Sequence, residues 1–153
     1  MNKDDINIRL DGLNILEKVL LPSTYQEGQE FIFDIKSQLL PTPKVDIVAT
    51  VVSVSIRKAN EEKIIARIIC EFWFEIKESK SILEKDVDGK MIIPVDMENF
   101  IKTISISTMR GIMYSEFRGT PIHNATLPII IMDSMKPIPG NVLGVENAPP
   151  IVE

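Results

Sequence analysis

Two side chains in this sequence belong to types that often do chemistry at neutral pH, and each type occurs once: His123 and Cys70. A lone histidine needs a nucleophile or an acidic partner to serve as a general base, and His123 falls in a stretch that resembles a loop. One cysteine and one histidine do not complete a zinc site, and a single cysteine forms no intrachain disulfide. The seven glycines are scattered and make no phosphate-binding loop. We therefore predict that the protein is not an enzyme and has no catalytic residue, metal or cofactor.

The unusual side chains are apolar ones on a face that is otherwise charged. In the stretch 63–77 the even positions are apolar and most odd positions are charged, but Ile65, Ile69 and Trp73 interrupt the charged series four residues apart. At about 3.3 Å per residue, each step along a strand is roughly 13 Å. Large exposed apolar patches are rare on monomers. Either a loop, a helix or a neighbouring subunit covers these side chains, or they bind apolar segments of another chain.

Cys70 shares the apolar face of this stretch with Phe72 and Phe74, and buried free cysteine behaves as a small hydrophobic residue. Methionine is a second apolar feature, since five of the seven fall in two candidate helices: Met97, Met109, Met113, Met132 and Met135. Methionine is flexible and adapts to many partners, although it also fills gaps in cores.

Four stretches carry strand patterns, namely 5–21 (broken near Asp11-Gly12), 29–39, 45–57 and 63–77. They predict a four-stranded, mainly antiparallel sheet with one covered face. After Pro94, with Asp96 as a candidate cap, Met97, Phe100 and Ile101 follow helical spacing. Residues 103–108 alternate and are rich in β-branched residues, as in a strand, which leaves the type of 103–109 open. The helical pattern on both sides favours a helix.

Pro128 predicts the start of a short second helix over 129–136. The predicted fold class is thus α+β, with a long helix and a short C-terminal helix packed on one face of the sheet. Residues 1–136 form this domain. Residues 137–153 are rich in proline and glycine and predict a flexible tail without regular packing.

The overall charge limits the partners. A net charge of −5 without a basic stripe disfavours nucleic acid and anionic membrane surfaces. No window approaches a membrane span, and no apolar signal follows the polar N-terminus. We expect a cytoplasmic protein. The stretch 103–113 has apolar residues on more than one side, so a second subunit is expected to cover some of them: Ile104, Ile106, Met109, Ile112 and Met113.

Three short motifs occur in a telling order: Ile93-Pro94-Val95, then Phe117-Arg118-Gly119-Thr120-Pro121, then Ala125-Thr126-Leu127-Pro128. With the four strands before them, they resemble the SecB family of bacterial protein-export chaperones over residues 5–136, and its divergent members in particular. The resemblance implies a homotetramer, assembled as a dimer of dimers, that holds unfolded polypeptide clients in apolar grooves without ATP. The expected client-binding residues are Phe72, Trp73, Phe74, Phe100, Met109, Met113 and Phe117.

The family also delivers clients to the SecA translocase ATPase. Ile69 and Glu71 match one piece of the translocase contact, whereas the stretch 15–18 and the tail differ from the family pattern. Some divergent members protect an antitoxin instead. The alternative function is a non-enzymatic scaffold dedicated to one partner, and a small-ligand-binding role is disfavoured because no cluster of convergent polar groups is visible.

Overall fold

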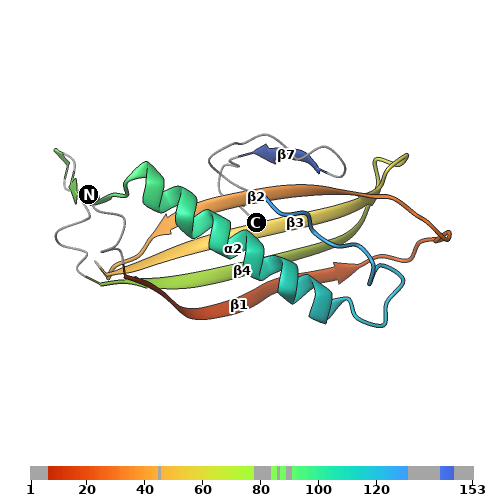
Figure 1. Cartoon of the computed structure of the whole chain (residues 1–153), viewed down its shortest axis with the longest axis horizontal. Helices are drawn as coiled ribbons and strands as arrows, with labels where there is room; N and C mark the ends of the chain where they lie inside the picture. The colour runs from red at the N-terminus through yellow and green to blue at the C-terminus, as the bar shows by residue number, and fades with distance from the viewer. Residues whose placement is uncertain are drawn as a thin grey trace.

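The computed structural model describes residues 7–44, 46–77, 84–85, 87–88, 91–130 and 142–146. A long helix lies across one face of a sheet (Figure 1). The elements are β1 (Ile8–Leu20), β2 (Phe31–Pro41), β3 (Ile47–Lys58), β4 (Ile64–Ile76), β5 (Glu84–Lys85), β6 (Met91–Ile92), α2 (Val95–Glu116) and β7 (Val142–Glu146). The main sheet has the order β1-β4-β3-β2-β7, and β1 to β4 are antiparallel. The predicted α+β fold with a four-stranded antiparallel sheet is therefore confirmed.

The core lies between α2 and the two central strands, β3 and β4. Because successive strand side chains point to opposite faces, the even positions of both strands share the face beneath the helix. Val52, Val54, Cys70 and Phe72 there have no exposed surface. Their alternation in the sequence is thus the direct cause of their burial.

Helix α2 settles the ambiguous stretch in favour of a helix. Its hydroxyl side chains donate hydrogen bonds to backbone oxygens four residues earlier: Thr103 Oγ1 to Asn99 O at 2.8 Å, Ser105 Oγ to Ile101 O at 2.8 Å, and Thr108 Oγ1 to Ile104 O at 2.9 Å. These bonds satisfy the hydroxyl groups inside the helix, which offsets the strand preference of the β-branched residues.

The ends of α2 differ in part from the prediction. Pro94, rather than Asp96, precedes the first helical residue, and no side chain caps the helix there. Asp96 and Glu98 instead lie in the first turn, where negative charge is favourable. The predicted glycine turn follows the other end, and Gly119 has the positive φ of 77° that glycine adopts without strain.

Strand β1 is the edge of the main sheet on the side away from β7, and among the described strands it pairs only with β4. The predicted break near Asp11-Gly12 is a β-bulge between Leu10 and Gly12, and a second irregularity falls between Ile15 and Glu17. Each bulge inserts an extra residue and increases the local twist. The C-terminal end of helix α2 reaches the C-terminal end of β1, where Lys18 Nζ lies 2.8 Å from Glu116 Oε2.

The C-terminal segment contains one further strand of the main sheet. Val142–Glu146, within the tail predicted not to pack regularly, forms β7 and lies parallel to β2. The physical reason is that β2 would otherwise present unpaired backbone groups at its outer edge, which is a ready template for an extended segment. Ile129 and Ile130 are not helical, and the remainder of the predicted second helix, 131–136, lies outside the described residues.

Candidate binding surface

Most of the expected client-binding residues lie inside the core. The structure buries Phe72, Phe74, Met109, Met113 and Phe117 to 2% exposure or less. The two phenylalanines of β4 face α2. Met109, Met113 and Phe117 are four residues apart, so they lie on the same side of the helix, toward the sheet. In the single chain, these five therefore offer no surface to a client, and their sequence pattern reflects core packing.

Trp73 and Phe100 are the two expected residues that remain exposed, at 38% and 50%. Trp73 is on the opposite face of β4 from the helix, between its cross-strand partners Gly12 and Ala49. Because both neighbours are small, they leave the indole ring uncovered. Phe100 is on the solvent side of α2, so the sheet separates the two aromatic residues and they do not form one site.

The other residues singled out on this face are more buried than their pattern suggested. Ile65 has no exposed surface, Ile69 is buried, and Glu71 is half-buried. In register, Ile69 lies between Glu17 and Ser53. The apolar series along β4 thus exposes Trp73 alone, and the predicted translocase-contact pair consists of one buried and one half-buried side chain.

The largest group of exposed apolar side chains in the described part of the chain was not predicted from the sequence. It lies on β1 and the residue after it, which we call the β1 edge surface: Leu10, Leu13, Ile15, Leu16, Val19, Leu20 and Leu21, all exposed. Leu16, at the second irregularity, is the most exposed of them at 56%. Adjacent apolar pairs such as Ile15-Leu16 were a signal, because a strand with one covered face should alternate. They place apolar side chains on both faces of an edge strand.

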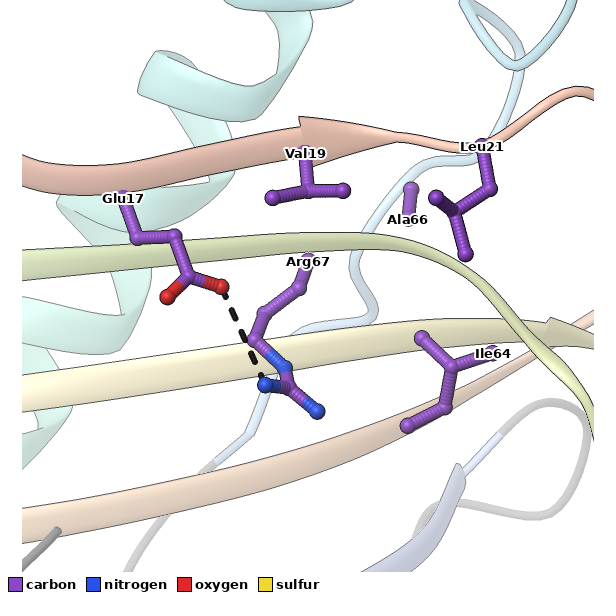
Figure 2. A pocket seen from close by; sticks show the side chains of 6 residues that line it. All are labelled: Glu17, Val19, Leu21, Ile64, Ala66 and Arg67. Carbon is purple, nitrogen blue, oxygen red and sulfur yellow. Dashed lines mark ion pairs between the residues drawn. The ribbon is translucent and has the colours of Figure 1, made fainter. Parts of the chain in front are cut away.

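A small hollow lies at the C-terminal end of this surface, on the face of the sheet away from α2 (Figure 2). Its volume is about 180 Å³, and it is lined by Glu17 and Val19 from β1, by Leu21 just after it, and by Ile64, Ala66 and Arg67 from β4. Drug-sized ligand sites are larger, at roughly 300–1,000 Å³. The hollow therefore suits a protruding apolar side chain better than a cofactor.

Charged groups form the rim of this hollow. Arg67 Nη1 lies 3.8 Å from Glu17 Oε1, and Arg67 Nε donates a hydrogen bond to Ser55 Oγ at 3.2 Å. Both partners of the ion pair are well exposed, so the pair contributes little to stability. The guanidinium group remains accessible to a carboxylate or a backbone carbonyl of an incoming chain.

The solvent side of α2 carries a further aromatic side chain, Tyr114, which is 68% exposed. It lies 14 residues, or about four helical turns, after Phe100. The oligomer expectation had rested on other residues. Of these, Ile106, Met109 and Met113 are buried beneath the helix, while Ile104 and Ile112 are half-buried against the core. The exposed apolar residues of α2 are thus fewer than expected: Val95 at its start and the outward aromatic residues Phe100 and Tyr114.

The two chemically reactive residue types are both in unreactive settings. Burial, and secondarily the negative charge of Glu116, raises the pKa of the Cys70 thiol to about 11, which keeps it protonated at neutral pH. His123 is exposed in a turn, with Nδ1 2.9 Å from the carbonyl oxygen of Thr120. Among the described residues, no three metal-binding side chains gather at one point. No helix in the described part of the chain is long and apolar enough to cross a membrane.

Comparison with known proteins places the fold. The sequence matches no protein-family model and no curated protein. Among solved structures, the chain is similar to the Mycobacterium tuberculosis Rv1957 SecB-like chaperone in complex with a ChAD peptide from the Rv1956 HigA1 antitoxin. The TM-score is 0.53 with 13% sequence identity, over 80% of this chain and 90% of that one. The fold of this chain is therefore SecB-like.

Proposed function

We propose that the protein is an ATP-independent holdase chaperone that binds unfolded polypeptides through exposed apolar side chains and catalyses no reaction. The observation that carries this proposal is the β1 edge surface, with Trp73 exposed on the neighbouring strand. Soluble monomers seldom expose so many clustered apolar side chains unless they bind another chain. The SecB-like fold supports the same class of function.

A second copy is the first partner that we propose for the β1 edge surface. Two copies of β1 related by a two-fold axis run antiparallel, so their backbones can pair and continue one sheet across the dimer. This pairing satisfies an edge that otherwise carries unpaired backbone groups. It leaves the sheet face with Trp73 and the hollow open to a client. The outward aromatics of α2, Phe100 and Tyr114, would then join two dimers into the homotetramer.

An extended client would gain on the order of 25 cal/mol for each Å² of apolar surface that it removes from water. Part of this gain is lost in ordering the client and its contact side chains. Binding is therefore expected to be moderate and spread over several shallow contacts. Since clients are held by burial alone, release needs no nucleotide. We place this activity in the cytoplasm.

A dedicated partner is the second candidate function. The solved neighbour was found with a peptide of an antitoxin, so a single antitoxin-like client is a specific alternative to general holding. A contact with the SecA translocase is less favoured, because Ile69, one of the two residues expected to make it, is buried.

Aggregation assays with two unrelated unfolded proteins, run without nucleotide, test both functions. A general holdase suppresses the light scattering of both clients at near-stoichiometric ratios. A dedicated protein suppresses neither and protects only its own partner. Failure with both clients would contradict general holding.

Trp73→Ala provides the matched variant. It should weaken client affinity roughly tenfold, as expected when an exposed aromatic anchor is lost. Ile129→Ala removes a comparable exposed apolar group elsewhere and should change affinity little. Because Trp73 is the only tryptophan, a shift of its fluorescence on client addition gives a second measurement.

A further inference from the structure

The outer edge of β2 is occupied by a segment of the chain's own tail. β7 lies parallel to β2 in Figure 1, with Phe33 paired to Val142, Ile35 to Val145 and Lys36 to Glu146. The core of the described residues lies between α2 and the four-stranded antiparallel part of the sheet. The tail adds a parallel strand outside this antiparallel part, at the edge of β2.

The pairing of β7 is weak by construction. It has 5 residues against the 11 of β2, and its register is irregular between Phe33 and Ile35. Parallel pairing is slightly less stable per residue than antiparallel pairing. Gly144 lies within the strand, and glycine weakens a strand interior. Such a strand can leave the sheet at a small cost in free energy.

The edge that β7 covers is longer than β7 itself. Among the described strands, none pairs with β2 on this side beyond Lys36. Outside the positions paired with β7, this strand has half-buried apolar side chains on both faces: Phe31, Ile32, Leu39 and Leu40. A strand added to a sheet edge gains affinity from backbone hydrogen bonds, and its alternating side chains contact groups on both faces.

We propose that the outer edge of β2 is a second client site and that β7 is a displaceable strand on it, so that tail and client compete for this edge. The occupant is an extended, apolar polypeptide segment, and β7 is the observation that this edge accepts such a segment. This inference rests on the proposed holdase function and adds its regulation. A client binds this edge only when β7 has left it. The apparent affinity of the edge for clients is therefore the intrinsic affinity multiplied by the fraction of molecules in which the edge is free.

A reversible lock on β7 tests this competition in the full-length chain. Lys36 is exposed and its Cα is paired with that of Glu146, so the double variant Lys36→Cys/Glu146→Cys can close a disulfide between two strands about 4.8 Å apart. The native Cys70 is buried and stays out of the reaction. The oxidised form should bind an unfolded client at least roughly tenfold more weakly than the same protein after reduction.

The opposite change opens the edge. Val142→Pro/Val145→Pro places prolines at two of the β7 positions that are paired with β2, and proline lacks the backbone N–H that a strand donates to its neighbour. This variant should hold clients several-fold more tightly than the parent. The matched control, Ala148→Pro/Ile151→Pro, adds two prolines with the same spacing outside β7 and should behave as the parent.

The outcomes separate the two proposals. Equal binding by the oxidised and reduced forms, failure of the disulfide to close, or weaker holding by the opened variant would each overturn the competition while leaving the holdase function standing. If neither the parent nor the opened variant binds any client, the holdase function itself is wrong. Binding by the opened variant alone would support both.

Discussion

Strands β1 and β4 are neighbours of equal length, 13 residues each, and both are rich in apolar residues, yet their environments are opposite. β4 lies between β1 and β3 and beneath α2, and nearly all its apolar side chains are buried. β1 has one neighbour, and α2 meets it near one end through the Lys18–Glu116 ion pair. Most of its apolar side chains are exposed.

The difference teaches that burial in this fold follows position in the sheet rather than apolar content. A central strand is covered by two neighbours and one helix, whereas an edge strand needs a partner from outside the chain. The first region should therefore respond to substitution with a loss of stability, and the second with a loss of association.

The largest effect is expected from Met113→Ser/Phe117→Ser. As groove residues these two would tolerate serine, but the structure buries both beneath α2. Large-to-small core substitutions cost roughly 2–5 kcal/mol for methionine and 3–5 kcal/mol for phenylalanine, and the polar hydroxyl adds to this. The sum is comparable with the total free energy of unfolding of a native protein, about 5–15 kcal/mol, so the variant should be largely unfolded even without denaturant. Urea titrations followed by circular dichroism measure this. Phe100→Ser/Tyr114→Ser, on the exposed side of the same helix, should stay within about 1 kcal/mol of the parent.

Cys70 gives a kinetic measure of how firmly the β4 side of the core is closed. Its thiolate is the reactive form, and burial raises the pKa of Cys70 to about 11. Labelling by a disulfide reagent at pH 7.5 or thereabouts should be on the order of 1,000-fold slower in the native protein than in urea, since it requires local opening. Rapid native labelling would mean that β4 is not covered as described.

The same thiol gives a pH dependence whose sign is fixed by the raised pKa. The folded state retains the proton more strongly than the unfolded chain, whose thiol has a pKa of about 8.5. The stabilising contribution is therefore complete below pH 8.5 or so and is lost as the pH rises toward about 11. Cys70→Ala should remove this alkaline loss from the stability profile.

The β1 edge surface should respond in association rather than in stability. Leu13→Glu/Leu20→Glu places like charges at a two-fold pairing of β1 strands, and it should weaken self-association by roughly 100-fold. Because both leucines are exposed, the folded monomer should persist. Sedimentation of the parent as a dimer or tetramer and of the variant as a folded monomer would support the comparison. Ile129→Glu, at an exposed position outside the β1 edge surface, is the control. A parent that is monomeric at micromolar concentration contradicts the paired edge.

The smallest effect concerns the two glycines around the end of α2. Gly119 has a positive φ of 77°, so Gly119→Ala should destabilise the protein by about 1–2 kcal/mol. Gly111 lies within the helix with no atom near the position of an added Cβ, and alanine there should stabilise by up to about 1 kcal/mol. Opposite signs in the two unfolding curves would confirm the turn geometry.

Local patterns in the sequence determined most of the framework. The alternation over 63–77 predicted β4 and its buried face, and Asp11-Gly12 predicted a break in the first strand, which the structure shows as a bulge. Helical spacing around the ambiguous stretch 103–109 predicted α2. These features depend on side-chain period and on backbone preferences that act over a few residues, and both can be seen in a single chain. The residue order was also sufficient to suggest a SecB-like fold.

The binding surface depended on contacts between distant parts of the chain. Phe72 and Met113 were expected at a groove because apolar character is the same in a core and in a binding site. Only the crossing of α2 over β3 and β4 decided that they are buried. The order β1-β4-β3-β2-β7 likewise makes β1 an edge and gives Trp73 small neighbours, although strand order leaves no local signal in sequence. Exposure is set by which elements lie next to one another, and that is decided by the tertiary structure.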